Sequence, residues 1–351
     1  MKTLKIIKPD DWHVHFREGE FLEKLVLETC TVYQRAIVMP NLKIPITSLK
    51  LAKKYKSEII KFSNSNKKFQ PLMTFYLTEN IDVDDLIRAH KEKYLFAVKL
   101  YPSGATTNSS RGVKNIEKVF LVLEKMSKYG IPLLIHGEVN DKKVDVFDRE
   151  KVFIDKNLRH IYLNFPNLKI TLEHITTKYA ADFVNHTKSN LKASITPHHL
   201  MINRSHMLEH KIRPHYYCLP ILKREEDRKA LLEMATSGNE NFFLGTDSAP
   251  HIIENKENAC GCAGVFNTRH SIEMLIQLFE DEKKLNNLEK FVSINGSKHY
   301  ELPQNNEFVI YKKDNQAINF PDYLNIDKKN KIKIFKPPFN IYWKLAKSLI
   351  T

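Results

Sequence analysis

Short apolar runs alternate with longer segments of helical periodicity along most of the chain. Segments 20–33, 80–93 and 115–130 repeat apolar residues with helical spacing, and the last stops at Gly130. Strands that alternate with helices form parallel βαβ units, and eight units predict a closed (β/α)8, or TIM, barrel of the α/β class. The eight apolar runs are DWHVHF (11–16), RAIVMPN (35–41), FQPLMTFYL (69–77), LFAVKLY (95–101), IPLLIHG (131–137), LKITLEH (168–174), LKASIT (191–196) and NFFLGTD (241–247).

Polar residues stand at or just before the carboxyl ends of these runs. In a TIM barrel that end carries the active site, so residues far apart in the sequence meet there. Histidines that merely pack in a core would not be expected to fall so consistently at the ends of strands. The residues are His13, His15, Asn41, Lys99, His136, His174 and Asp247.

The first run shows two faces. Alternation along a strand predicts that His13, His15 and Arg17 share one face. The apolar residues Trp12, Val14 and Phe16 then share the other. A solvated edge strand has the same pattern, so His-x-His alone does not decide between an edge strand and a ligand site. The polar residues at the other strand ends favour the ligand site.

Composition limits the classes of protein. The chain has 351 residues, 42% of them hydrophobic, which is enough for a sizeable core. It has no apolar run long enough for a membrane span and no apolar signal segment at its start, so we expect a cytoplasmic protein without membrane contact. Four irregularly spaced cysteines do not suggest a disulfide framework, and reduced thiols are expected.

The net charge of +14 raises the question of nucleic-acid binding. We expect no nucleic-acid partner, because the lysines are scattered and no nucleic-acid module accompanies them. In the densest patch, Lys331 and Lys333 alternate with Ile332 and Ile334, the pattern of an edge strand with one solvated face. The charge favours small anionic substrates.

Four histidines and an aspartate at one barrel mouth predict a metal site, and imidazole with carboxylate suits zinc. Lys99 does not fit this set, because an ammonium group beside metal cations is strongly unfavourable. Either Lys99 reaches water at the barrel rim, or it is chemically modified and carries a negative charge.

Eight motifs carry a more specific signal. Together they resemble the dihydroorotases, the single-domain bacterial type within the amidohydrolase superfamily. The resemblance runs from about residue 4 to about residue 300, and we predict a barrel domain of residues 1–304 followed by an extension, 305–351, packed on the barrel. It also implies a homodimer. The motifs are HVHFREG, AIVMPN, KLYPSGATTNSSRG, LLIHGEV, EHITTK, PHYYCLPILK, LGTDSAPH and CGCAG.

The resemblance implies two Zn²⁺ ions in each subunit. Residues matching the family's ligands would hold one zinc through His13, His15 and Asp247, and the second through His136 and His174. Lys99 would be an N6-carboxylysine, with its carbamate bridging both ions. The positive charge of the two zinc ions would then exceed the summed negative charge of the carbamate, Asp247 and a bridging hydroxide by about one. This remaining positive charge suits an anionic substrate.

The implied reaction is the reversible cyclisation of N-carbamoyl-L-aspartate to L-dihydroorotate in de novo pyrimidine (UMP) biosynthesis. In the hydrolytic direction the hydroxide bridging the metals would attack the ring carbonyl. Asp247 would act first as general base and then as general acid towards the leaving ring nitrogen.

The same resemblance assigns the substrate contacts. Arg17 would bind the substrate carboxylate, with Asn41 and His251 as partners. The backbones of Leu219 and Ala263 would contact the ring edge. The polar segment PSGATTNSSRG (102–112) is either an ordinary mobile loop or a lid that closes through Thr106 and Thr107.

Other polar residues receive a structural interpretation. His198 and His199 are expected to pack or to form hydrogen bonds around the site, and Glu173, which alternates with His174, is expected to face the helices. Glu138 could face either way. Two alternative functions stay open: another cyclic-amide hydrolase of the hydantoinase or dihydropyrimidinase type, and a non-catalytic barrel that serves as a scaffold.

Overall fold

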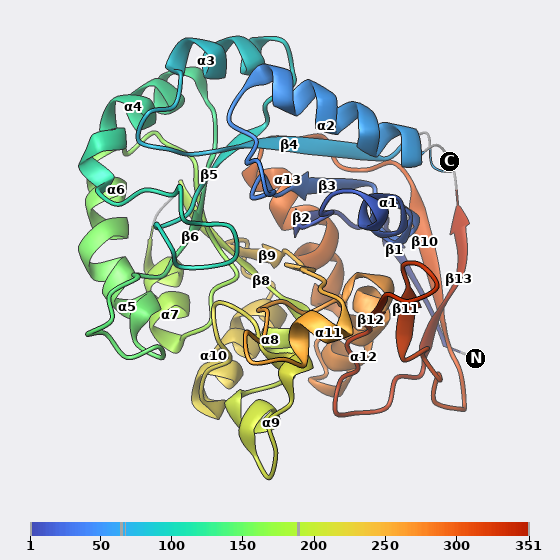
Figure 1. The fold of residues 1–351 in the computed structure, drawn as a ribbon. Helices are drawn as coiled ribbons and strands as arrows, with labels where there is room; N and C mark the ends of the chain where they lie inside the picture. The colour runs from blue at the N-terminus through green and yellow to red at the C-terminus, as the bar shows by residue number, and fades with distance from the viewer. Residues whose placement is uncertain (1, 64–65, 67, 188–189, 350–351) are drawn as a thin grey trace.

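The computed structural model describes residues 2–63, 66, 68–187 and 190–349. Eight parallel strands lie in chain order in one sheet and form a TIM barrel, which confirms the predicted fold (Figure 1). All eight predicted runs contain a barrel strand. The strands are β2 (Asp11–Val14), β3 (Arg35–Val38), β4 (Gln70–Tyr76), β5 (Ala97–Leu100), β6 (Leu133–His136), β7 (Ile170–Glu173), β8 (Leu191–Ile195) and β9 (Phe242–Leu244).

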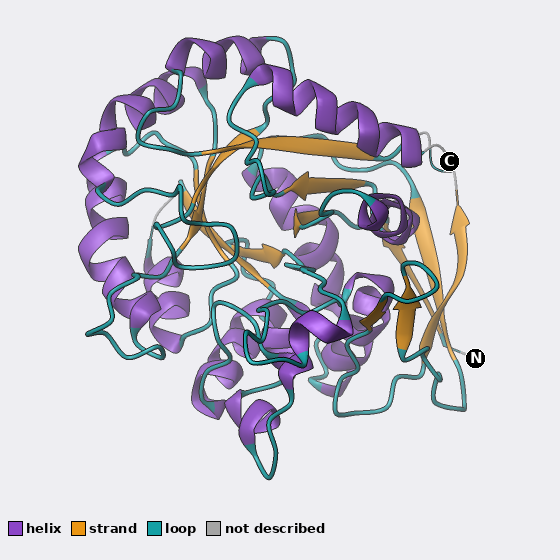
Figure 2. Cartoon of the chain, in the orientation of Figure 1, coloured by secondary structure: helices purple, strands orange, loops and turns teal. Residues whose placement is uncertain are grey.

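Helices surround the strands (Figure 2). Side chains at Ser48, Asp82 and Thr177 accept backbone hydrogen bonds at the starts of three helices. Gly130, predicted as a helix stop, ends α4 with a φ of 69°, which glycine adopts without strain. The helices are α1 (Glu20–Val32), α2 (Leu49–Phe62), α3 (Val83–Lys91), α4 (Phe120–Tyr129), α5 (Arg149–Phe153), α6 (Arg159–Asn164), α7 (Lys178–His186), α8 (Pro197–Met201), α9 (Arg204–Leu208), α10 (Glu225–Thr236), α11 (Ile253–Lys256), α12 (Ser271–Asp281) and α13 (Asn295–His299).

The barrel closes through backbone groups of residues near its mouth. The amide of Asp247 donates to the carbonyl of His13 at 2.9 Å, and the amide of His15 donates to the carbonyl of Ser248 at 3.1 Å. These bonds join β2 to the segment that follows β9. Closure of the barrel therefore holds three of the predicted ligand residues side by side.

Two apolar clusters reflect the alternation along the strands. One cluster fills the layer between strands and helices, and the smaller one, which includes Ile37, Leu134 and Phe243, fills the barrel interior. Trp12 belongs to the interior cluster, whereas Val14 and Phe16 lie in the outer layer. The prediction that these three residues share one face is therefore wrong for Trp12. The reason is a register irregularity in the β2–β3 pairing between Asp11 and Val14.

Residues near both ends of the chain form a separate three-stranded antiparallel sheet. β1 (Thr3–Ile7) pairs with β10 (Phe308–Lys313), and β10 pairs with β13 (Trp343–Leu349). Part of the predicted extension thus pairs, through β10, with a strand that precedes the barrel, and the division at residue 304 stays a prediction.

A small hairpin, β11 (Tyr323–Asn325) with β12 (Lys331–Lys333), also lies in this region. In β12 the two lysines are exposed and Ile332 is buried, which confirms the predicted half-solvated strand. Among the described residues, no helix is both long enough and apolar enough to cross a membrane.

Candidate active site

One pocket at the carboxyl ends of the strands brings the predicted residues together. All of them line it except Lys99, which is fully buried, and His251, which contacts Arg17. Tyr101, Ala249 and Gly264 also line the pocket and were not predicted. The full lining is His13, His15, Arg17, Asn41, Tyr101, Thr106, Thr107, His136, His174, Leu219, Asp247, Ala249, Ala263 and Gly264.

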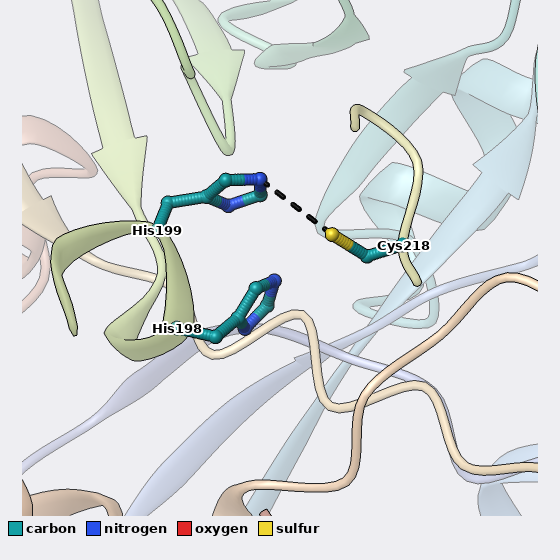
Figure 3. Close-up of side chains that lie close together, drawn as sticks. All are labelled: His198, His199 and Cys218. Atoms are coloured by element: carbon teal, nitrogen blue, oxygen red, sulfur yellow. Dashed lines mark hydrogen bonds between the residues drawn. The ribbon is translucent and has the colours of Figure 1, made fainter. Parts of the chain in front are cut away.

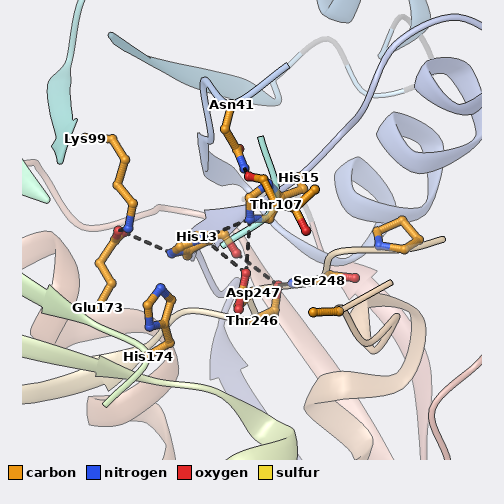
Figure 4. A network of polar contacts seen from close by, with 12 residues as sticks. His13, His15, Asn41, Lys99, Thr107, Glu173, His174, Thr246, Asp247 and Ser248 are labelled. Carbon is orange, nitrogen blue, oxygen red and sulfur yellow. Dashed lines mark hydrogen bonds and ion pairs between the residues drawn. The ribbon is translucent and has the colours of Figure 1, made fainter. Parts of the chain in front are cut away.

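Three donor atoms form a compact triangle at this mouth (Figure 4). His13 Nε2 lies 3.2 Å from His15 Nε2, and each lies 3.1–3.2 Å from Asp247 Oδ1. In a tetrahedral zinc site with bonds of about 2.0–2.1 Å, neighbouring ligand atoms lie about 3.3–3.4 Å apart. The triangle therefore has the spacing of one face of a metal's ligand shell, and these three residues could together hold a metal ion.

Backbone strain lies at site residues. Arg17, His174 and Asp247 have φ values of 58°, 42° and 44°, in the left-handed region that residues other than glycine rarely adopt. His174 directly follows β7 and Asp247 follows β9. The left-handed backbone lets His174 face the pocket although it directly follows Glu173, which alternation along β7 already points inward.

Glu173 is the clearest departure from the predicted orientations. Its carboxylate is buried inside the barrel, where Oε2 pairs with Lys99 Nζ and Oε1 lies 3.1 Å from His13 Nδ1 (Figure 4). The prediction that Glu173 faces the helices is wrong. Alternation along β7 points Glu173 inward, and the left-handed backbone of His174 brings that residue to the pocket as well.

Lys99 does not reach water at the rim, because its side chain is fully buried. Burial lowers the pKa of its ammonium, although the charge of Glu173 opposes this shift. The rim interpretation is therefore excluded, and Lys99 is a buried amine whose partner Glu173 also contacts His13.

Burial sets the charge of several histidines. It lowers the pKa of His15 to about 4 and that of His174 well below its ordinary value, so both imidazoles are neutral and can serve as metal ligands. Burial also disfavours the charged form of His13, but the charges of Glu173 and Asp247 outweigh it and raise the pKa to about 9. This part of the site attracts a cation.

Two further histidines lie beside the triangle. The ring of His174 is centred 5.1 Å from that of His13 and 4.8 Å from that of His136. His174 Nδ1 is buried and has no hydrogen-bond partner within the part of the chain that the structure describes. His136 Nε2 lies 2.9 Å from Glu138 Oε2, so Glu138 faces the site.

Arg17 forms a cationic wall of the pocket. Its Nε donates to the carbonyl of Pro250 at 3.1 Å, and Nη2 lies 3.0 Å from Nε2 of His251. Burial, together with the charge of Arg17, lowers the pKa of His251 to about 3, so the ring is neutral. His251 Nε2 also lies 3.0 Å from the carbonyl of Ala263, so this nitrogen makes one of two bonds according to the tautomer: it accepts from Arg17 or donates to Ala263. The guanidinium keeps further N–H groups for a ligand.

The loop over the pocket is tied to Asn41. Asn41 Nδ2 donates to the carbonyl of Thr107 at 3.0 Å, and Asn108 Nδ2 donates to the carbonyl of Asn41 at 3.0 Å. Within the loop, the Thr106 amide donates to Ser109 Oγ at 2.9 Å. Thr106 and Thr107 line the pocket, so this loop forms part of its wall.

A sequence profile of the amidohydrolase family matches residues 5–314. The chain is 46% identical to a dihydroorotase of Agrobacterium fabrum over 98% of this chain and 99% of that one. Its structure superposes on the dihydroorotase of Saccharomyces cerevisiae, crystallised with 5-fluoroorotic acid, with a TM-score of 0.90, 32% identity and 99% coverage of both chains. The chain belongs to the dihydroorotase branch of the amidohydrolase family.

This membership confirms the resemblance drawn from the motifs. An L-hydantoinase (dihydropyrimidinase) of Arthrobacter aurescens also superposes, with a TM-score of 0.80, but it is 14% identical and covers 99% of this chain and 84% of its own. That similarity shows the shared fold alone.

In this member of the dihydroorotase branch, His198, His199 and Cys218 form a second group of donors (Figure 3). His199 Nε2 lies 3.0 Å from the carbonyl of Pro220, which can only accept, so that nitrogen carries a proton. His199 Nδ1 lies 2.7 Å from the hydroxyl of Thr196. With both nitrogens engaged, His199 lacks a lone pair for a metal.

His198 Nδ1 accepts from Asn267 Nδ2 at 3.0 Å, and Cys218 Sγ donates to the carbonyl of Pro220 at 3.3 Å. The hydrogen-bonding role predicted for the two histidines is therefore confirmed.

Proposed function

We propose that the chain is a dihydroorotase that interconverts N-carbamoyl-L-aspartate and L-dihydroorotate at the mouth of its barrel. The observation that carries the proposal is the triangle of His13 Nε2, His15 Nε2 and Asp247 Oδ1, which opens into a pocket that Arg17 also lines. Such a site pairs a metal-activated reaction centre with a cation for an anionic substrate.

The residues fit a binuclear zinc centre. His13, His15 and Asp247 would hold one ion, and His136 and His174 the second. Lys99 would be carboxylated and bridge the two, which supplies a reason for burying an amine beside cations. When bound, zinc would activate a water molecule and polarise the ring carbonyl.

The chain's own side chains would bind the substrate and move the proton. Arg17 would hold the substrate carboxylate, with Asn41 and His251, while the backbones of Leu219 and Ala263 would contact the ring edge. Asp247 would take the proton from the attacking water and deliver it to the leaving ring nitrogen.

Thr106 and Thr107 would close the loop over the bound substrate and exclude water. This role is supported by the bonds between that loop and Asn41.

Glu173 changes the charge balance expected from the sequence. That balance left about one positive charge at the site, and the buried carboxylate of Glu173 offsets it. Attraction for an anionic substrate would then depend mainly on Arg17, whose charge is not paired with a carboxylate among the described residues. The substrate would supply the missing anion.

The need for a carboxylate on the substrate separates this function from that of a hydantoinase or dihydropyrimidinase. Hydantoin and dihydrouracil are cyclic amides without a carboxylate, and they would leave Arg17 unpaired. A scaffold role is disfavoured because none of the predicted ligands is missing. A cytoplasmic location and a homodimer remain part of the proposal.

Replacement of Asp247 by asparagine tests the proposal. Asp247→Asn should lower the turnover of L-dihydroorotate by about 10²- to 10⁴-fold, the contribution of a general acid–base group, while the variant still binds the substrate. Asp10→Asn is the matched control, because Asp10 is a buried aspartate that pairs with Arg35 away from the pocket. A near-normal rate for Asp247→Asn would refute the acid–base role.

A further inference from the structure

Glu173 is a buried carboxylate between two residues of the proposed metal centre. Its side chain is fully buried, and the charged or ionisable side chains within 4 Å of its carboxylate among the described residues are those of Lys99 and His13. A buried carboxylate costs free energy unless its oxygens are compensated. Oε2 is compensated by Lys99, whereas Oε1 has only the nearby Nδ1 of His13 and no hydrogen bond, so this oxygen is free to accept a proton held on Nδ1.

The contact with His13 concerns which ring nitrogen carries the proton. Glu173 Oε1 lies 3.1 Å from Nδ1 of His13 as an ion pair, and neither atom has another hydrogen-bond partner in the described part of the chain. Nε2 of the same ring belongs to the triangle with His15 and Asp247. With Nε2 turned to a metal, the ring proton would lie on Nδ1, where the carboxylate of Glu173 is in place to accept it. In the described part of the chain, no carboxylate from outside the proposed centre contacts a ring nitrogen of His15 or His174.

The contact with Lys99 concerns the modified side chain. Carboxylation forms a bond between Nζ of the neutral amine and the carbon of CO₂, moves one C=O electron pair onto oxygen and releases one N–H proton to solvent. The product keeps a single N–H on Nζ. In a fully buried position that N–H needs an acceptor, and Glu173 Oε2 already pairs with Nζ.

We propose that Glu173 is the positioning residue of the metal centre, holding the Nδ1 side of His13 and the Nζ–H of carboxylated Lys99 at the same time. This inference rests on the proposed function, because it assigns a role towards the zinc ions and the carbamate named there. Glu173 itself does not bind zinc in this arrangement, although its donor atoms lie within 4.8 Å of those of His13 and His174.

The test uses metal-free protein reconstituted with zinc and ¹³C-bicarbonate. Zinc affinity is measured by competition with a chromophoric chelator, and the carbamate is followed by ¹³C NMR. Glu173→Gln should bind zinc about 10- to 100-fold more weakly, the usual effect of losing a partner behind a metal ligand. At a bicarbonate concentration that saturates the unaltered protein, the carbamate signal of Glu173→Gln should be lost.

Glu150→Gln is the matched control, since Glu150 is a buried carboxylate held by Thr176 and Thr177 without contact to a proposed ligand. Its zinc affinity and carbamate signal should not change. If Glu173→Gln does not fold, Lys99→Met and the double variant Lys99→Met/Glu173→Gln replace it, because neither leaves an unpaired ammonium. Without the carbamate both variants should hold zinc only weakly, so the comparison uses the residual zinc affinity of His13, His15 and Asp247, which should be about tenfold or more lower in the double variant than in Lys99→Met.

The outcomes separate this inference from the proposed function. Unchanged zinc affinity and an intact carbamate in Glu173→Gln would overturn the role of Glu173 while the function stands. Loss of one whole zinc at saturating metal would make Glu173 a ligand and would also overturn it. If the unaltered protein binds no zinc and does not open L-dihydroorotate, the proposed function fails first.

Discussion

Replacement of Arg17 by lysine tests how the pocket holds its substrate. The guanidinium has five N–H groups, and two of its nitrogens are anchored, Nε to Pro250 and Nη2 to His251. The remaining N–H groups can pair with both oxygens of a carboxylate. Lysine keeps one positive charge but has a single ammonium nitrogen and no planar fork, so it cannot keep the anchors and also bind two oxygens.

The expected loss follows from the bonds removed. One charge-assisted hydrogen bond contributes about 1.5–3 kcal/mol, and about 1.4 kcal/mol corresponds to a factor of ten. Arg17→Lys should therefore raise the KM for L-dihydroorotate by about 10- to 100-fold. The value of kcat should fall much less, because the guanidinium is assigned to the carboxylate and not to the reacting bond. Initial rates follow from the loss of ultraviolet absorbance on ring opening.

Arg35→Lys is the matched control. Arg35 is also a buried arginine, but it pairs with Asp10 at the amino end of β3, away from the pocket. This variant should lose thermal stability and keep the KM of the unaltered protein. An unchanged KM in Arg17→Lys would refute the assignment of Arg17 to the substrate carboxylate.

Three other changes probe different parts of the account. Lys99→Ala should lose zinc and activity together, and a variant that keeps both metals at full occupancy would exclude the carbamate bridge. Asn41→Ala removes the bond to the loop carbonyl, so hydrogen exchange of residues 102–113 should speed up and KM should rise by up to about tenfold; unchanged exchange would contradict the tether. Burial lowers the pKa of His198 to about 4 from an ordinary 6.5, so this group's contribution to stability is present above pH 6.5 and is lost as pH falls towards 4. The free energy of unfolding in urea should therefore fall between pH 6.5 and pH 4 by about 2–3 kcal/mol more in the unaltered protein than in His198→Gln. An equal fall in both proteins would show that His198 is not the source.

The barrel could be predicted because its strands are buried on both faces. Such strands are short, nearly continuous apolar runs, and polar residues at their carboxyl ends stand out. The positions of His13, His15, Lys99 and Asp247 followed from those ends. The periodicity indicated which end of the barrel carries the site, and the resemblance to the dihydroorotases supplied the roles of the residues there.

Local irregularities could not be predicted. The register shift in β2 moves Trp12 into the barrel interior, and the left-handed backbone of His174 lets two consecutive residues reach the site. The first breaks the alternation from which the face of Trp12 was predicted, and the second breaks the alternation from which the orientation of Glu173 was predicted. The pairing of β1 with β10 joins residues about 300 positions apart, and short-range patterns carry no signal for such a contact.

The most direct measurement is the ring opening of L-dihydroorotate by the purified protein with zinc and bicarbonate, with hydantoin and dihydrouracil assayed in parallel. The account predicts turnover of L-dihydroorotate alone, loss of that turnover with a chelator and recovery with zinc. Turnover of hydantoin or dihydrouracil in place of L-dihydroorotate would contradict the assigned substrate, and turnover that persists after complete metal removal would contradict the assigned site.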